Sequence, residues 1–310
     1  MQTFIEILKS ILFGIVEGVT EWLPISSTGH MIILDEFVKL NVREEFWNLF
    51  LVVIQLGAIL AVVVLFWEKI WPFGLTANAA RAKRGRRDDA GEYQRRGSKE
   101  EADIIPLGGI CIKTDILILW IKILIACLPA AVIGLLFDDW IDEHLYNFPC
   151  VAGALIIFGI LFIIIEKRNE GKKPRVRSVA RLDYLTVVLI GVFQVLAAVF
   201  PGTSRSGATI IGALLLGVAR PVAAEFTFYL AIPVMFGASL LKVLKFVKAG
   251  LSFTGMEGVI LLVGCVVAYV VSVLVIKFLM EYIKKHNFIP FGIYRIALGL
   301  LLFLYFFIIH

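Results

Sequence analysis

The stretch Glu17-Gly-Val-Thr-Glu21-Trp-Leu-Pro24-Ile-Ser26-Ser27-Thr28-Gly29-His30 interrupts an apolar block over residues 5–34. A second apolar block, residues 184–217, is interrupted by Pro201-Gly202-Thr203-Ser204-Arg205-Ser206-Gly207-Ala208-Thr209. Proline removes a helical hydrogen bond, and clustered Ser, Thr and Gly favour a turn after which a new helix can start. Each block is therefore expected to form two short helices separated by a break. We call the two quoted stretches the first and second motif.

The two interrupted blocks resemble each other. Four positions match at one constant offset, namely Gly14 with Gly191, Glu17 with Gln194, Pro24 with Pro201, and Ser27 with Ser204. We interpret this match as an internal duplication of one broken hairpin followed by three membrane spans. Three spans per unit invert the second copy in the membrane, and inverted repeats with broken apolar segments mark a binding site near the bilayer midplane.

Composition places the chain in a membrane. Hydrophobic residues make up 60% of the 310 positions and charged residues 18%, whereas soluble domains carry about 45–50% and about 25%. A transmembrane helix needs about 20 apolar residues. Six further blocks approach or reach this length: 46–67, 116–137, 150–165, 222–247, 258–276 and 288–309. The predicted fold class is all-α, with six transmembrane helices and two re-entrant helical hairpins in two inverted repeats.

The charged loops predict the orientation. Basic residues cluster in residues 69–113 and 166–181, whereas residues 138–149 are acidic. The positive-inside rule puts the basic loops in the cytoplasm and the acidic loop outside. We expect one membrane domain, residues 1–310, with repeat one at about 1–166, repeat two at about 182–310 and a basic cytoplasmic loop at about 69–113. These loops account for the net charge of +5, which therefore does not indicate nucleic acid as a partner.

Two carboxylates stand in the first motif, where burial in a membrane is costly. Glu17 and Glu21 are one helical turn apart and share a face. A charged group at the bilayer centre costs about 2.5–3.5 kcal/mol on insertion scales. A divalent cation, Mg²⁺ or Ca²⁺, held by Glu17 and Glu21 would offset their repulsion. The alternative is an interfacial pair whose carboxylates reach water.

Hydroxyl groups and one imidazole follow these carboxylates. Ser26, Ser27, Thr28 and Gly29 are expected to open a helix whose free N–H groups attract phosphate. Ser27 and His30 are three residues apart and can share a face, which suits a nucleophile and a proton carrier. The alternative is a helix cap beside a structural histidine.

The second motif supplies a second helix start with a cation. Arg205 is the only charged residue between Asp183 and Arg220, and guanidinium groups match phosphate oxygens in pairs. The alternative is an Arg205 that pairs with one of the two motif carboxylates for structure alone. Further substrate-binding candidates in this motif are Gly202, Thr203, Ser204, Ser206 and Thr209. Elsewhere, Glu225 is interpreted as a hydrogen-bonding residue between helices, with Arg295 as a candidate partner.

Such a set of donors and carboxylates inside apolar walls favours a lipid phosphate or diphosphate as ligand. Hydrolysis of a lipid diphosphate is the expected activity, because transport alone needs no nucleophile beside a proton carrier. The alternative is a transporter or flippase of a lipid phosphate, since broken hairpins are typical of secondary transporters.

Both motifs, together with Gln55-Leu-Gly57 and Glu225-Phe226, resemble the signatures of the undecaprenyl-diphosphate phosphatase family of the bacitracin-resistance type. The resemblance covers the whole apolar chain and departs from the family at a long basic insertion within residues 76–112. It implies hydrolysis of undecaprenyl diphosphate to undecaprenyl phosphate, which recycles the lipid carrier of peptidoglycan synthesis. It further implies dependence on a divalent metal and a site that opens to the outer face of the bacterial plasma membrane.

The catalytic residues are then expected to be Glu17, Glu21, Ser27, His30 and Arg205. Either Ser27 attacks the terminal phosphorus with His30 moving the proton, or water attacks directly with help from a glutamate. The sequence does not separate these routes. It also leaves the oligomeric state open, with a homodimer as one option.

Overall fold

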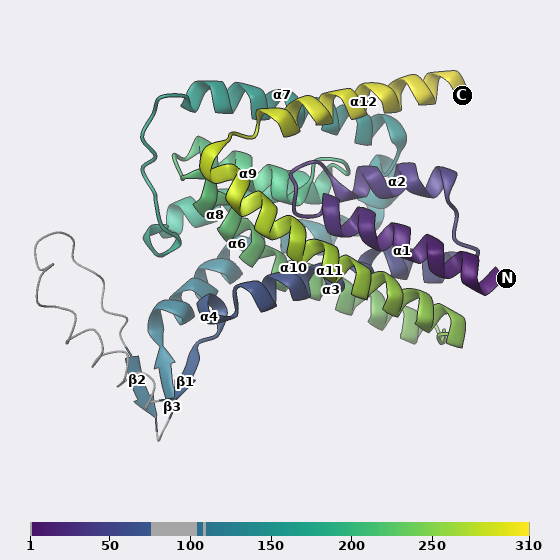
Figure 1. Ribbon diagram of the computed structural model, residues 1–310, viewed down its shortest axis with the longest axis horizontal. Coiled ribbons are helices and arrows are strands. Elements are labelled where there is room, and N and C mark those ends of the chain that lie inside the picture. The colour runs from purple at the N-terminus through teal and green to yellow at the C-terminus, as the bar shows by residue number, and fades with distance from the viewer. Residues whose placement is uncertain (1, 76–103, 108–109, 310) are drawn as a thin grey trace, which may run out of the picture.

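The computed structural model describes residues 2–75, 104–107 and 110–309, and most of these are helical. Figure 1 shows a layered bundle of roughly parallel and antiparallel helices, with a small sheet beside one end. The helices are α1 (Gln2–Thr20), α2 (Ser27–Phe37), α3 (Glu44–Leu65), α4 (Trp67–Ile70), α6 (Thr114–Leu145), α7 (Phe148–Asn169), α8 (Tyr184–Val199), α9 (Arg205–Leu215), α10 (Arg220–Lys248), α11 (Gly255–Lys285) and α12 (Ile289–Ile309), with a 3₁₀ turn η1 (Val179–Arg181).

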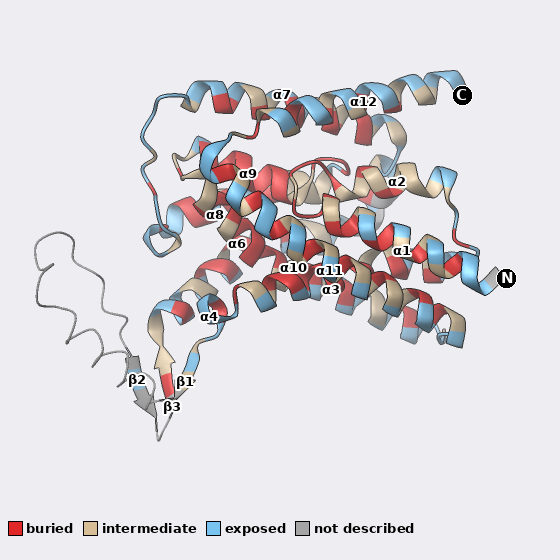
Figure 2. Ribbon diagram, viewed as in Figure 1, coloured by how far each residue is buried: buried red, intermediate tan, exposed pale blue. Residues whose placement is uncertain are grey.

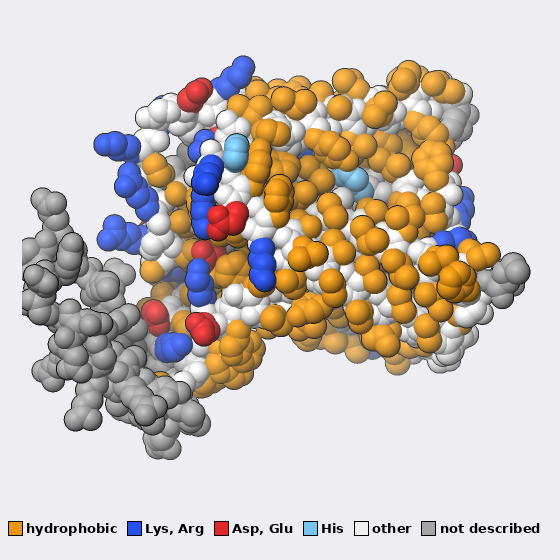
Figure 3. All heavy atoms as spheres, viewed as in Figure 1, with side chains coloured by type: hydrophobic (Ala, Val, Ile, Leu, Met, Phe, Trp, Pro, Cys, Tyr) orange, Lys and Arg blue, Asp and Glu red, His pale blue; other side chains and the backbone are white. Residues whose placement is uncertain are grey.

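Six helices of the described chain are long and apolar enough to cross a membrane, which confirms the predicted spans. They are α3, α6, α7, α10, α11 and α12. Large apolar side chains lie on their outer faces, such as Leu136 and Phe307, which are 69% and 77% exposed. In Figure 3 hydrophobic side chains cover the bundle, and most visible Lys and Arg side chains gather at one end. The chain is therefore a polytopic membrane protein.

Two helix pairs, α1–α2 and α8–α9, reach only partway through the bundle. Helices α2 and α9 have 11 residues each, so at about 1.5 Å per residue each covers roughly half of a hydrocarbon core about 30 Å thick. Figure 1 shows the pairs approaching from opposite ends, with their connecting segments near the middle of the bundle. We call residues 21–26 the first break and residues 200–204 the second break. Their depth in a bilayer stays a prediction.

The two halves of the chain repeat one packing contact. Helix α1 packs against α11, and α8 packs against α6. Gly14 and Gly191, which match in the sequence, both lie where an added Cβ would meet the backbone of the facing helix, at Gly264 and Ala126 respectively. The close approach explains why both positions lack a side chain. It supports the duplication, while the inversion of the second copy stays a prediction.

The helix caps shift the sequence match by one residue. Ser26 caps α2 by accepting the N–H of Gly29 at 3.3 Å, and Ser204 caps α9 by accepting the N–H of Gly207 at 3.1 Å. Both serines have a positive φ, 77° and 68°, which is uncommon outside glycine. The gapless match of Ser27 with Ser204 is therefore wrong.

An extra residue in the second break causes this shift. Gly202 has a φ of 91°, and a Cβ added there would lie 2.6 Å from the carbonyl oxygen of Val151. Only glycine fits such a position. Ser27 consequently corresponds to Arg205, because each is the first residue of its short helix.

Three short strands within the basic loop were not predicted. β1 (Phe73–Leu75), β2 (Ile104–Leu107) and β3 (Ile110–Lys113) form an antiparallel sheet in the order β1-β3-β2. Residues 76–103 and 108–109 of the predicted loop lie outside the described residues. The all-α prediction holds for the bundle itself.

Buried residues line the inward faces of the helices, as Figure 2 shows. Helix α9 is buried along nearly its whole length, from Ser206 to Leu214. An apolar helix so fully enclosed is held by packing on all sides, so its N-terminus has a fixed place inside the bundle.

A buried ion pair joins the ends of three helices. Glu166 at the end of α7 accepts Nε–H of Arg220 on α10 at 2.9 Å and the N–H of Phe288, next to α12, at 3.0 Å. Replacing Arg220 by methionine leaves that buried carboxylate without its cation, which is expected to lower the free energy of unfolding by about 2–4 kcal/mol. Thermal unfolding in detergent measures this loss. Arg168→Met, an exposed arginine of α7, is the control, and equal stability of both variants would contradict the prediction.

Candidate active site

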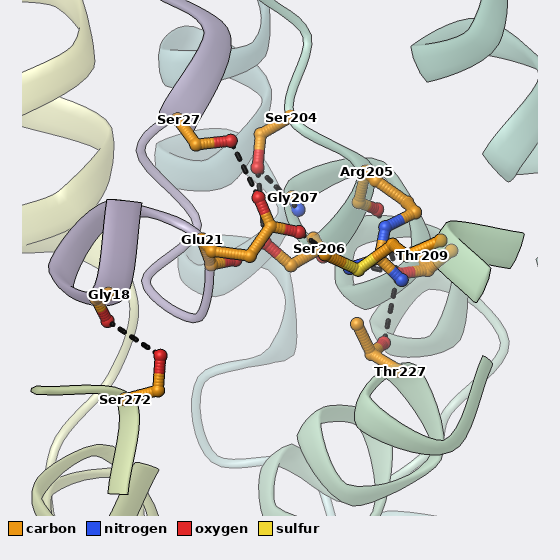
Figure 4. A network of polar contacts seen from close by, with 11 residues as sticks. Gly18, Glu21, Ser27, Ser204, Arg205, Ser206, Gly207, Thr209, Thr227 and Ser272 are labelled. Carbon is orange, nitrogen blue, oxygen red and sulfur yellow. Dashed lines mark hydrogen bonds and ion pairs between the residues drawn. The ribbon is translucent and has the colours of Figure 1, made fainter. Parts of the chain in front are cut away.

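The two breaks meet at the carboxylate of Glu21. Its Oε2 accepts the hydroxyl of Ser27 at 2.6 Å, and its Oε1 accepts Nη2–H of Arg205 at 2.6 Å. Figure 4 shows the carboxylate between these two side chains, one from each half of the chain. The structure thus brings together three of the five predicted catalytic residues.

The N-termini of two helices converge on this point. Ser27 is the first residue of α2 and Arg205 the first residue of α9, and both contact Glu21. The first N–H groups of a helix lack acceptors within the helix, and its N-terminus carries a partial positive charge. Two such ends beside one arginine form a seat for an anion of high charge.

Arg205 keeps donors available for such an anion. Its Nη2 contacts Glu21 and lies 3.1 Å from Sδ of Met235. Its Nη1 is buried and has no hydrogen-bond partner among the described residues. A buried guanidinium donor without an acceptor is costly, so a phosphate oxygen at Nη1 would stabilise the site.

Glu17 is, after Arg205, the second charged side chain of the site with buried atoms that lack hydrogen-bond partners among the described residues. It is 1% exposed, and neither of its carboxylate oxygens has a hydrogen-bond partner in the part of the chain that the structure describes. Hard cations such as Mg²⁺ and Ca²⁺ take carboxylate oxygens as ligands, so Glu17 and Glu21 fit the predicted cation. The described residues contain no cluster of three or more His, Cys, Asp or Glu suited to a metal. Such a cation would therefore need other ligands, such as phosphate oxygens or water.

Both ring nitrogens of His30 have partners other than the Ser27 hydroxyl. Its Nδ1–H donates to the carbonyl oxygen of Ser26 at 2.6 Å, and its Nε2 lies 2.7 Å from the hydroxyl of Tyr294 on α12. When neutral, His30 therefore accepts a hydrogen bond from Tyr294 at Nε2. Ser27 was expected to share a helix face with His30, whereas in the structure the Ser27 hydroxyl donates to Glu21.

The remaining candidates of the second motif mostly shape the second break. Ser206 donates to the backbone carbonyl of Glu21 at 3.2 Å and so joins the two breaks. Thr209 donates to the carbonyl of Arg205 at 2.9 Å and contacts the hydroxyl of Thr227, as Figure 4 shows. These two hydroxyls are thus used within the protein.

Three other predicted residues line the start of a helix or a break. Thr203 is fully buried, and its hydroxyl has no partner within the described ranges, so its role in substrate binding stays a prediction. Thr28 is half-buried on the first turn of α2, and Gly29 follows it. Gly202 and Ser204 set the backbone of the second break as described above.

Comparison with known proteins identifies the family of this chain. The family model described as bacitracin resistance protein BacA matches residues 10–301. The chain belongs to this family. It is similar to undecaprenyl-diphosphatase 1 of Clostridium acetobutylicum, with 55% identity over 98% of this chain and 99% of that protein. It is also similar to the undecaprenyl-diphosphatases of Desulfitobacterium hafniense, with 56% identity over 98% of each chain, and of Enterococcus faecalis, with 52% identity over 97% of each.

In this BacA-family chain, the predicted pairing of Glu225 with Arg295 is wrong. Glu225 accepts hydrogen bonds from Lys69 at 2.8 Å and from the hydroxyl of Tyr229 at 2.6 Å, so it does contact a second helix. Arg295 was its predicted partner but contacts backbone carbonyls near both breaks instead. Tyr294 was missed as well, because a tyrosine in an apolar block gives no sign of its partner.

Proposed function

We propose that the chain hydrolyses undecaprenyl diphosphate to undecaprenyl phosphate and inorganic phosphate where its two breaks meet. The observation that carries this proposal is the convergence of Ser27 and Arg205, each at a helix N-terminus, on the carboxylate of Glu21. Membership of the BacA family and the names of the relatives support the substrate. Flipping of a polyprenyl phosphate lipid is less favoured, since transport requires no hydroxyl held by a carboxylate.

The diphosphate would lie between the two breaks. Nη1 of Arg205 and the free N–H groups at the starts of α2 and α9 would bind phosphate oxygens. Glu17 and Glu21 would hold a divalent cation, Mg²⁺ or Ca²⁺, whose charge offsets that of the diphosphate. The lipid tail would stay in the bilayer, beside the apolar outer faces of the surrounding helices.

In the reaction, Ser27 Oγ attacks the terminal phosphorus and its proton passes to Glu21 Oε2, 2.6 Å away. The bond from that phosphorus to the bridging oxygen breaks, and undecaprenyl phosphate leaves. Water then attacks the phosphoserine, phosphate departs, and Ser27 regains its proton from Glu21. His30, held by Ser26 and Tyr294, would exchange a proton with the leaving phosphate. The alternative route is direct attack by water activated by a glutamate.

The site would open to the outer face of the plasma membrane. Helices α1 and α2 approach from the end of the bundle opposite the small sheet and the basic residues, as Figures 1 and 3 show. The positive-inside rule assigns that basic end to the cytoplasm. A homodimer stays a prediction.

Release of phosphate in detergent tests this function. The purified protein is mixed with undecaprenyl diphosphate in micelles, and inorganic phosphate is measured over time. We expect release from the diphosphate and none from undecaprenyl phosphate. A folded protein that releases no phosphate in micelles, yet moves the lipid across sealed vesicles, would be a flippase and would refute the proposal.

Cation dependence should trace to Glu17. Chelation with EDTA is expected to stop phosphate release, and Mg²⁺ or Ca²⁺ to restore it. Glu17→Gln should raise the cation concentration for half-maximal rate by at least about tenfold, because a ligand charge is lost. Gln194→Leu changes the matching position of the other repeat, which is also buried without partners for its amide in the described chain, and should leave this concentration unchanged. An unchanged requirement in Glu17→Gln would contradict the assignment.

A further inference from the structure

Arg295 on α12 is a fully buried arginine whose hydrogen-bond acceptors in the described chain are all backbone carbonyl oxygens. Its guanidinium also lies over the ring of Phe158, 5.8 Å from the ring centroid. Arg295 is 0% exposed. It donates to Pro24 of the first break at 3.1 Å, and to Gly202 and Thr203 of the second break at 3.1 and 2.8 Å. Weaker contacts of 3.5 Å reach two carbonyls of α7, those of Ala154 and Leu155. No carboxylate of the described residues pairs with it.

A buried cation without a counter-ion is costly and persists only where other groups compensate. The compensating groups here are carbonyls that the breaks leave without helical partners. Arginine suits this task, because its planar group offers five donors in fixed directions, whereas lysine offers three around one point. One guanidinium therefore joins the two breaks, which come from opposite halves of the chain.

The guanidinium lies directly behind the first turn of α9. A Cβ added to Gly207 would lie 2.9 Å from Nη1 of Arg295, and the N–H of Gly207 is taken by the capping Ser204. The C=O and N–H of a trans peptide point in opposite directions. Because Arg295 holds the Thr203 carbonyl, it turns the N–H of Ser204 to the opposite side of the break.

We propose that Arg295 is a positioning residue for the hydrolysis. It fixes the first break against the second, so that Ser27 and Arg205 meet at Glu21, and its positive charge lies behind the anion seat. This inference rests on the proposed function, since it concerns the same reaction. Arg295 acts through the two breaks and does not itself touch the substrate.

The test compares Arg295→Met and Arg295→Lys with the wild type in the phosphate-release assay. Loss of the shared contact should lower kcat at least about thirtyfold in Arg295→Met, with KM within about threefold, because alignment matters mainly in the transition state. Arg295→Lys keeps the charge but not the fork and should lose at least about fivefold in kcat. Arg220→Met, which breaks a buried ion pair outside the site, serves as the matched stability control and should keep its kcat.

Thermal unfolding of all variants in detergent accompanies the kinetics. If Arg295→Met does not fold, Arg295→Lys alone decides. The inference is overturned if Arg295→Lys keeps the kcat of the wild type, or if Arg220→Met loses kcat to the same extent at the same loss of stability. Failure of the wild type to release phosphate would instead reject the proposed function, so the two failures are distinguishable.

Discussion

Replacing Ser27 by alanine is expected to lower kcat for phosphate release by at least about a thousandfold, or roughly 4 kcal/mol of transition-state stabilisation. The hydroxyl lies 2.6 Å from Glu21 Oε2 and at the first turn of α2. No other hydroxyl in the described chain donates to that carboxylate, so the loss has no direct substitute. This result also separates attack by Ser27 from direct attack by water. In a second experiment, mass spectrometry of acid-quenched wild type should find a phosphoryl group on Ser27.

The control is Ser10→Ala in α1. Ser10 is a fully buried serine, and its hydroxyl donates to the carbonyl of Ile260 at 2.6 Å, away from the site. Removing it should cost about 1 kcal/mol of stability and leave kcat within about twofold of the wild type. Near-normal turnover by Ser27→Ala would exclude the serine route and leave direct attack by water.

Arg205→Lys should lower kcat/KM about a hundredfold, which corresponds to roughly 2.7 kcal/mol. Lysine keeps the charge but cannot place one nitrogen on Glu21 and another on a phosphate oxygen. In the structure Nη2 contacts Glu21 while Nη1 has no partner among the described residues. The loss should therefore appear mostly as weaker binding of the diphosphate, measured by steady-state kinetics and by competition with inorganic diphosphate.

Arg220→Lys is the matched control for this charge-conserving change. Arg220 also contacts a glutamate, Glu166, but stands outside the site. Its replacement should reduce kcat/KM no more than about threefold, as expected for a change without contact to the substrate. Equal losses in the two lysine variants would show that a general effect on folding had been measured.

Features that depend on residues close together in the chain were predicted from the sequence. The six spans follow from apolar length, and a proline followed by Ser, Thr and Gly predicted the start of both short helices. The structure then identified Ser26 and Ser204 as their caps. The meeting of the two motifs was also predicted, because broken segments of inverted repeats are expected to form one site at the repeat interface. The contact of Arg205 with a motif glutamate was the alternative interpretation, and the structure shows it at Glu21.

Features that depend on contacts between distant segments were missed. Arg295 was assigned to Glu225, since a lone arginine in an apolar block suggests an acidic partner. Its actual acceptors are carbonyls that come together only after both breaks have formed. The one-residue shift at Gly202 was missed for a similar reason, because the close approach of Val151 decides it.

The central claim is that the first and second breaks build one site. A double-mutant cycle on kcat/KM for Glu21→Gln and Arg205→Lys tests it most directly, because residues in contact couple whereas distant ones contribute additively. The 2.6 Å contact predicts that the double variant loses little more than the worse single variant. Losses that multiply across the two positions would mean that the motifs act independently, and would contradict the account.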